Sequence, residues 1–293
     1  MNAVNAVKTM KIFRSLSDLR AWRNAQPSNA RIGFIPTMGA LHAGHVSLMR
    51  LARERCSVRV VSIFVNPLQF APQEDFAQYP RPFEKDAALC DEEKIDVLFA
   101  PEASELYSEE FSTFVEETLV SGPLCGALRP GHFRGVATVV LKFFNLVQPH
   151  SAYFGQKDAQ QCAVIERMVR DLNLNLEVIR GETLRESDGL AMSSRNVYLS
   201  QEERATARRI YESLNLVKSG VKNAENISDL IARAKQHLGP EFRVQYFEVL
   251  DAETLQPLES AAPTRKILAV VAAYLGKTRL IDNVLIQSLF NGT

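Results

Sequence analysis

The first 185 residues of the chain alternate short apolar runs with segments of helical periodicity. The apolar runs predict five strands: Arg31–Pro36, Val58–Val65, Ile95–Ala100, Ser151–Phe154 and Leu176–Arg180. Apolar residues at helical spacing between and around them predict five helices: Ser17–Asn24, Gly44–Glu54, Phe83–Lys94, Gly135–Val147 and Asp158–Leu172. Such alternation is typical of an α/β fold, a Rossmann-like parallel sheet with helices on both faces.

The pattern changes beyond Ser200, where two helices precede three strands. The predicted helices are Gln201–Ser219 and Ile227–Leu238, and the predicted strands are Arg243–Leu250, Lys266–Tyr274 and Arg279–Ile286. Helices followed by strands indicate a smaller C-terminal α+β domain with an antiparallel sheet. We therefore predict two domains, residues 1–185 and 186–293, with a hinge near Gly181–Ser200 that lacks a flexible linker composition.

Composition narrows the function classes. The 34 Lys and Arg residues balance 34 Asp and Glu residues, so charge gives no indication of a nucleic-acid or membrane partner. No apolar run reaches the length of a membrane span, and no secretory leader is evident, so we expect a cytoplasmic protein. Four unpaired cysteines fit a reducing compartment.

The most informative segment is Thr37-Met38-Gly39-Ala40-Leu41-His42-Ala43-Gly44-His45, between a predicted strand and a predicted helix. Such a junction directs backbone N–H groups and the positive end of a helix toward an anion such as phosphate. His42 and His45, three apart, would share one face of the helix's first turn and donate to that anion. The alternatives are a capping or surface pair and a zinc site, which lacks an HExxH or CxxC partner set.

In parallel sheets ligands bind beyond the carboxyl ends of the strands, and polar segments follow the other predicted strands. Lys157, which follows Gly155 and precedes a helix, can reach phosphate oxygens, or can be a solvated helix-start lysine. Ser193, Ser194 and Arg195 offer hydroxyls and a guanidinium suited to triphosphate, or form a serine-rich cap or turn. With Arg185 and Gly189 they would form a mobile phosphate clamp.

Two further segments have a chemical and a structural interpretation. The branched face with Val139 and Val140 could line an apolar pocket, with Arg129 or Arg134 near a substrate carboxylate, or could be core. Glu84 or Asp86 could help to hold Mg²⁺ through a triphosphate, or both could be surface residues of an acidic helix.

Taken together, these segments resemble the pantoate–β-alanine ligase family from about Ile12 to Ile286. The resemblance is carried by five segments: Pro36–His45, Phe64–Phe70, Gly131–Val136, Phe154–Asp158 with Gln160-Gln161, and Asp188–Asn196. The His-x-Gly-His element alone is shared with class I aminoacyl-tRNA synthetases and many nucleotidyltransferases. The Ser-Ser-Arg-Asn segment is similar to the Lys-Met-Ser-Lys-Ser loop of that superfamily.

The resemblance implies an ATP-dependent ligase that condenses pantoate with β-alanine to pantothenate through pantoyl adenylate, releasing pyrophosphate and AMP. It implies that phosphates are handled by His42, His45, Lys157, Ser193, Ser194 and Arg195. It implies ATP contacts at Met38, Gly155, Asp158, Leu184 and Met192, and pantoate contacts at Pro36, Met38, Asn66, Gln69, Gln161, Val139 and Val140. It further implies a homodimer, and Mg²⁺ that is supplied with ATP and linked to Asp86, although Lys85 stands where many relatives have a second acid. The residues before Lys11 look like an extension outside the family, which we expect to be disordered.

Two rival functions stay open at this point. A nucleotidyltransferase of the same superfamily would use the same phosphate-binding residues, but would keep the nucleotide in its product. A non-catalytic nucleotide-binding or RNA-binding module belongs to another class, which neutral charge and the full set of donors disfavour. No Ser-His-Asp or Cys-His set is evident, so catalysis is expected to rest on positioning and electrostatics.

Overall fold

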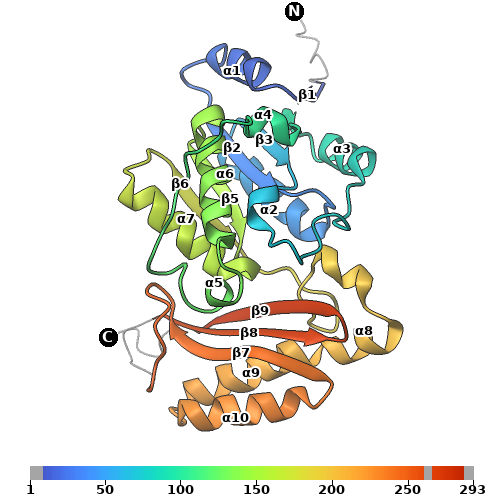
Figure 1. Cartoon of the computed structure of the whole chain (residues 1–293), viewed down its shortest axis with the longest axis vertical. Helices are drawn as coiled ribbons and strands as arrows, with labels where there is room; N and C mark the ends of the chain where they lie inside the picture. Colours follow the sequence, from blue (N-terminus) through green and yellow to red (C-terminus); the bar gives the residue numbers. More distant parts are fainter. Residues whose placement is uncertain (1–8, 261–265, 287–293) are drawn as a thin grey trace, which may run out of the picture. The chain divides into compact units, whose positions relative to one another are not determined.

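A computed structural model describes residues 9–260 and 266–286, within which six strands form one parallel sheet in the order β1-β4-β3-β2-β5-β6 (Figure 1). The strands are β1 (Lys11–Phe13), β2 (Ile32–Thr37), β3 (Val58–Ile63), β4 (Val97–Phe99), β5 (Ser151–Gly155) and β6 (Glu177–Gly181). The helices of this region are α1 (Leu16–Asn24), α2 (Ala43–Arg55), α3 (Phe83–Glu92), α4 (Ala103–Leu106), α5 (Cys125–Leu128), α6 (His132–Val147) and α7 (Ala159–Asp171), with 3₁₀ turns η1 (Pro67–Gln69) and η2 (Gln156–Asp158).

All six strands run parallel, but the direction in which successive strands are added to the sheet reverses between β2 and β5. From β2 the chain proceeds outward through β3 and β4, whereas β5, which pairs with the other edge of β2, leads outward to β6. Gly33 and Phe34 lie beside Ser151 and Ala152 in this central pair. The carboxyl ends of β2 and β5 therefore flank the switch point at which open α/β sheets bind ligands.

Alternating residues of β2 face different helices. The Phe34 ring packs edge-on against Phe143 of α6, with ring centroids 5.8 Å apart. Ile35, which points to the opposite face, belongs to an apolar cluster with Met49 of α2 and Cys90 of α3. Helices thus cover both faces of the parallel sheet, as the alternation of strands and helices predicts.

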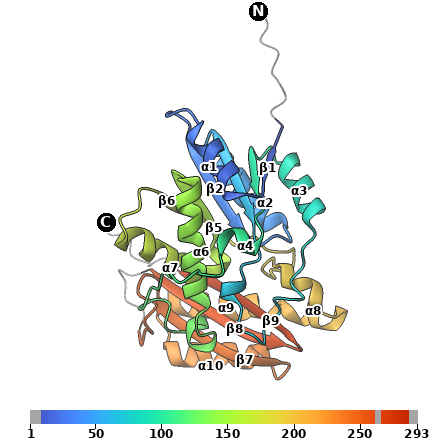
Figure 2. The same cartoon turned by 45° about the horizontal axis from the view of Figure 1, so that its top comes forward.

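The C-terminal part of the chain forms an antiparallel sheet of three strands, β7 (Phe242–Asp251), β8 (Ile267–Leu275) and β9 (Thr278–Ile286). The helices α9 (Arg209–Lys222) and α10 (Ile227–Leu238) lie side by side along this sheet (Figure 2). A shorter helix, α8 (Gln201–Ala207), and a 3₁₀ turn, η3 (Ser194–Tyr198), precede them. Leu214, Leu230, Phe247 and Val271 are fully or almost fully buried in the shared apolar core.

Contacts divide the chain into two compact units whose borders are not simple breaks in the sequence. The first unit takes Met1–Glu117, Arg129–Gly155 and Val164–Gly181; the second takes Thr118–Leu128, Gln156–Ala163 and Glu182–Thr293. The segment that carries Lys157 is therefore grouped with the antiparallel sheet, although it follows a strand of the parallel one. The domain borders inferred from sequence remain a prediction.

The fold class is confirmed, with two corrections. The sequence pattern missed the edge strand β1, which is only three residues long and pairs with β4. The single helix predicted over Gln201–Ser219 is wrong, because α8 ends at Ala207 and α9 begins at Arg209. Residues 1–8, most of the predicted disordered extension, lie outside the described residues. No helix within the described ranges is long and apolar enough to cross a membrane.

Candidate active site

His42 and His45 form a reciprocal cap at the start of α2, directly beyond the end of β2. The Nδ1 atom of His42 accepts a hydrogen bond from the Gly44 N–H at 3.1 Å. The Nδ1 atom of His45 accepts one from the His42 N–H at 3.2 Å. His42 is thus the N-cap, with extended backbone, and does not lie in the first helical turn as predicted.

The cap decides which ring nitrogen carries the proton. An imidazole whose Nδ1 accepts a hydrogen bond carries its proton on Nε2 in the neutral form. The rings of His42 and His45 lie with centroids 4.2 Å apart and an interplanar angle of 50°. The pair therefore offers two Nε2–H donors close together at a helix N-terminus, an arrangement suited to phosphate oxygens.

Asp86 of α3 holds the turn that precedes this cap. Its Oδ2 accepts from the Ala40 N–H at 2.7 Å, and its Oδ1 accepts from the Leu41 N–H at 2.8 Å. Asp86 is 1% exposed, and burial raises the pKa of its carboxyl, while the Leu41 and Ala40 N–H groups act in the opposite direction. Ala40, with φ of 50°, and Gly39, with φ of 84°, bring the turn within reach of the carboxylate.

These contacts do not fit the predicted role of Asp86 as a Mg²⁺-linked carboxylate. Both of its oxygens point to backbone N–H groups, and the side chain is buried, so a metal would have to displace those hydrogen bonds. Within the described ranges, no cluster of three or more His, Cys, Asp or Glu side chains is suited to a metal ion. The same residue instead fixes the turn that presents His42, a role that sequence analysis did not foresee.

A chain of amide groups forms at the carboxyl end of β3. Asn66, 1% exposed, donates from Nδ2 to Oε1 of Gln69 at 3.1 Å, and its Oδ1 accepts from the hydroxyl of Tyr107 at 2.8 Å. The Nε2 of Gln69 in turn lies 3.0 Å from the Sδ of Met38. The structure therefore brings together three of the residues assigned to the acid pocket, Met38, Asn66 and Gln69, beside the His42 turn.

An ion pair supports the backbone of this amide chain. The guanidinium of Arg129 binds the Glu74 carboxylate at 2.5 Å and donates to the Gln69 carbonyl oxygen at 3.2 Å. Nδ1 of His132 lies 2.8 Å from the same oxygen. Burial is the largest single effect and raises the pKa of Glu74, but Arg129, the Ala71 N–H and His132 together lower it more, so the net shift is downward. Because Arg129 already pairs with Glu74, its assignment to a substrate carboxylate is not supported.

Helix α6 lies so close to η1 that only glycine fits at one position. A Cβ on Gly135 would lie 2.2 Å from the Leu68 carbonyl oxygen, far inside any allowed contact. Val139 and Val140, one turn further along α6, are each 5% exposed, as their core interpretation requires. The guanidinium of Arg134 lies 3.9 Å from the centroid of the Phe114 ring.

Lys157 lies in η2, two residues beyond Gly155, the last residue of β5. Its ammonium lies 3.9 Å from Asp158 Oδ1, and its side chain is 19% exposed. Asn283 of β9 donates to the carbonyl oxygens of both Gln156 and Lys157, each at 2.9 Å. Gln161 follows in the first turn of α7 and is half-buried.

The segment Arg185–Asn196 folds into a hairpin-like loop. Arg185 pairs with Ala191 through an antiparallel bridge, and the Met192 N–H donates to the Leu184 carbonyl at 3.0 Å. Ser193 caps η3, where its Oγ accepts from the Arg195 N–H at 3.3 Å. The capping interpretation therefore holds for Ser193, while Ser194 and Arg195 lie in the 3₁₀ turn that it begins.

The predicted site residues thus gather in two groups. In the first unit, the ends of β2 and β3 bring together Pro36, Met38, His42, His45, Asn66 and Gln69. In the second unit are Lys157, Asp158, Gln161, Leu184, Met192, Ser193, Ser194 and Arg195. Tyr107, Asp282 and Asn283 were missed, although a polar pair inside an otherwise apolar strand is a signal that the sequence displays.

The chain matches the family model for pantoate-beta-alanine ligase over residues 11–285. The chain belongs to the pantoate–β-alanine ligase family. A pantothenate synthetase of Thermotoga neapolitana is 50% identical over 281 residues, covering 94% of this chain and 100% of that protein. Pantothenate synthetase 1 of Bradyrhizobium diazoefficiens is 51% identical over 283 residues, covering 95% and 99% respectively.

Solved structures of pantoate–β-alanine ligases share the fold. The pantothenate synthetase of Thermus thermophilus matches with a TM-score of 0.89 and 45% identity, over 94% of this chain and 99% of that one. The ligase of Francisella tularensis, solved with β,γ-ATP and β-alanine, matches with a TM-score of 0.80 and 35% identity, over 94% and 97%. The chain is an enzyme of this ligase family.

Proposed function

We propose that the protein condenses pantoate with β-alanine in two steps, through pantoyl adenylate. The observation that carries this proposal is the His42–His45 cap, which presents two Nε2–H donors beyond the end of β2, at the switch point of the sheet. Family membership and the ATP and β-alanine named for the Francisella enzyme support the choice of substrates.

In the first step a pantoate carboxylate oxygen attacks the α-phosphorus of ATP. A new P–O bond forms, the bond from the α-phosphorus to the bridging oxygen breaks, and pyrophosphate leaves. Negative charge develops on the phosphate oxygens, which the donors of His42, His45 and Lys157 would stabilise. Ser194 and Arg195 would bind the leaving pyrophosphate, with Gly155, Asp158, Leu184 and Met192 along the nucleotide.

In the second step the amine of β-alanine attacks the acyl carbon of the adenylate. A C–N bond forms, the acyl C–O bond to phosphate breaks, AMP leaves, and the amine loses a proton to solvent or phosphate. Gln69, oriented by Asn66 and Met38, would bind pantoate, and Gln161 would be a second pantoate ligand. Mg²⁺ would enter as the MgATP complex, without Asp86 as a ligand.

Closure of Arg185–Asn196 over ATP, with the residues beyond Ser200 as a lid, would protect the adenylate from water. A lid variant such as Gly189→Ala would then release more AMP than pantothenate, because a Cβ there would come within 2.4 Å of the Tyr211 ring. Equal amounts of the two products from a folded variant would refute the lid.

Association as a homodimer is a separate proposal that sedimentation would test.

The experiment that tests the mechanism is exchange of labelled pyrophosphate into ATP. Purified protein should catalyse this exchange when pantoate is present and β-alanine is absent, since the first step alone is reversible. Adding β-alanine should produce pantothenate and AMP in equal amounts. Formation of ADP, or turnover without exchange, would overturn the adenylate mechanism. Nucleotide retained in the product would favour the nucleotidyltransferase alternative.

A further inference from the structure

Asp282 places a carboxylate in the apolar face of strand β9. Leu280, Val284 and Ile286, which share that face by the alternation of the strand, all belong to the core packed against the helices. Asp282 is 3% exposed, and burial raises the pKa of its carboxyl. A buried carboxylate is costly unless it is paired, so this position requires a partner.

Arg185, at the start of the loop Arg185–Asn196, is that partner. Its guanidinium binds Asp282 through two contacts, at 2.5 Å and 3.0 Å, and lies 3.8 Å from the centroid of the Tyr211 ring. The same guanidinium donates to the carbonyl oxygen of Gly189 at 3.1 Å and to that of Asn283 at 3.2 Å. Asp282 thereby anchors the start of the loop, and the Arg185 guanidinium links that start to the Gly189 turn.

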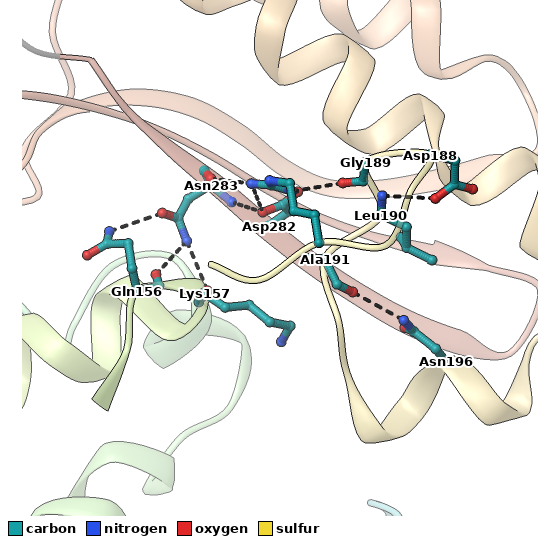
Figure 3. A network of polar contacts seen from close by, with 10 residues as sticks. Gln156, Lys157, Asp188, Gly189, Leu190, Ala191, Asn196, Asp282 and Asn283 are labelled. Atoms are coloured by element: carbon teal, nitrogen blue, oxygen red, sulfur yellow. Dashed lines mark hydrogen bonds and ion pairs between the residues drawn. The ribbon is translucent and has the colours of Figure 1, made fainter. Parts of the chain in front are cut away.

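Asn283, the next residue, holds the segment that carries Lys157. Its Nδ2 donates to the carbonyl oxygens of Gln156 and Lys157, and its Oδ1 accepts from Nε2 of Gln156 at 3.1 Å (Figure 3). Asn283 is 3% exposed, and both its amide hydrogens and its oxygen are thus engaged. Because successive residues of a strand point to opposite faces, Asp282 and Asn283 hold two different segments from one point.

We propose that Asp282 and Asn283 are a positioning pair that sets the spacing between Lys157 and the Ser193–Arg195 segment. This inference rests on the proposed function, in which both segments bind the phosphates of ATP. The pair touches backbone and Arg185 rather than the reacting atoms, so it acts through Lys157 and the loop. A rigid spacing matters because a misplacement of about 1 Å can cost about 10²-fold in rate.

Asn283→Ala tests the hydrogen bonds that hold the segment carrying Lys157. We expect the KM for ATP to rise, or exchange to slow, by roughly tenfold to 10²-fold, with the KM for pantoate changed less than about twofold. Asn283→Ser, which keeps one donor, should fall between wild type and Asn283→Ala. Asp251→Ala is the matched control, since Asp251 is a buried acid of β7 whose Oδ1 accepts from the Glu253 and Thr254 N–H groups of its own turn.

The control should lower thermal stability without changing the ratio of the two KM values. An Asn283→Ala protein that loses stability like Asp251→Ala but keeps wild-type ATP kinetics would overturn the proposal. So would a parallel rise in the KM for ATP and for pantoate, because that is the result expected of a general loss of folding.

The ion pair that holds the loop Arg185–Asn196 is tested with Asp282→Leu, Arg185→Met and the double variant. Each single variant leaves one charge buried without its partner, whereas the double variant replaces the pair by apolar groups and should regain Tm. If the ion pair between Asp282 and Arg185 positions the loop, the double variant regains Tm but does not regain exchange activity. Recovery of both Tm and exchange activity would show that the ion pair between Asp282 and Arg185 acts through stability alone, and would overturn the proposal.

Calorimetric titration of ATP into wild type and variants separates this inference from the proposed function. If wild type binds ATP but shows no pantoate-dependent exchange, the proposed function fails. The ATP affinities of the variants still test whether Asp282 and Asn283 position the phosphate-binding groups. Weaker ATP binding in Asn283→Ala and in the double variant, by roughly tenfold or more, is the expected result. Unchanged ATP affinity in both variants would overturn the positioning pair.

Discussion

The imidazole ring centroids of His42 and His45 lie 4.2 Å apart, and the Nδ1 atom of each ring accepts a hydrogen bond from a backbone N–H. This relationship turns two side chains that could donate from either nitrogen into two donors of fixed orientation. It also links the proposed phosphate site to folding, because the same hydrogen bonds that cap α2 set the tautomer of both rings.

Removing a phosphate donor should slow the first step more than it weakens pantoate binding. His45→Ala and Lys157→Ala each delete a preorganised donor, which is typically worth about 10²–10³ in rate. Single-turnover formation of the adenylate, measured beside pantoate affinity, tests this. His45→Asn, whose amide can still accept from the His42 N–H, is the control that keeps the cap. Adenylation at the wild-type rate in both alanine variants would reject the assignment.

Asp86→Asn should disturb the turn before His42 without changing the response to Mg²⁺. The amide nitrogen would face one of the two N–H groups that the carboxylate now accepts from, at Ala40 and Leu41. Hydrogen bonds to charged groups contribute about 1.5–3 kcal/mol, so the free energy of unfolding should fall by about that amount. Adenylation should slow as well.

The Mg²⁺ titration separates the two roles of Asp86. If the carboxylate only holds the turn, the Mg²⁺ concentration that gives half-maximal activity stays at the wild-type value in Asp86→Asn. A large rise in that concentration would show that Asp86 contributes to metal binding after all.

Gly135→Ala should damage the acid pocket from the outside. The new Cβ would lie 2.2 Å from the Leu68 carbonyl oxygen, so η1 must shift and carry Gln69 with it. We expect the KM for pantoate to rise by roughly tenfold to 10²-fold, with a smaller effect on ATP. Gly122→Ala is the matched control, because its Cβ would meet nothing nearer than 3.6 Å. Normal pantoate kinetics in Gly135→Ala would contradict the proposed pocket.

Stability should depend on pH through Glu74. Burial raises the pKa of Glu74, but Arg129, with the Ala71 N–H and His132, brings the pKa below its ordinary 4.5 in the folded chain. A depressed carboxyl pKa contributes stability above pH 4.5 that is lost as the pH falls through the folded value. Glu74→Gln should therefore be less stable than wild type at pH 7, by about 1.5–3 kcal/mol.

Urea unfolding between pH 7 and pH 3 measures this contribution. The difference between wild type and Glu74→Gln should shrink as the pH falls below 4.5, because the wild-type carboxylate becomes protonated. A difference that stays constant over the whole range would show that the ion pair with Arg129 does not stabilise the fold.

Local pattern alone determined much of this protein. The alternation of apolar runs and helical periods predicted the parallel sheet and the antiparallel C-terminal sheet, because each element must bury one face. The order of residues around His42 and His45 predicted an anion site, since a strand followed by glycines and a helix leaves backbone N–H groups pointing outward. These features depend on neighbours in the sequence, which is why the sequence displays them.

Only the tertiary structure decided which partner each polar group meets. Asp86 lies more than forty residues from Ala40 along the chain, so no local pattern distinguishes a metal ligand from an acceptor of its N–H group. Asn283 lies 126 residues from Lys157, yet holds its carbonyl oxygen. Such contacts arise from the packing of distant elements, where burial forces each charge and amide to find a partner.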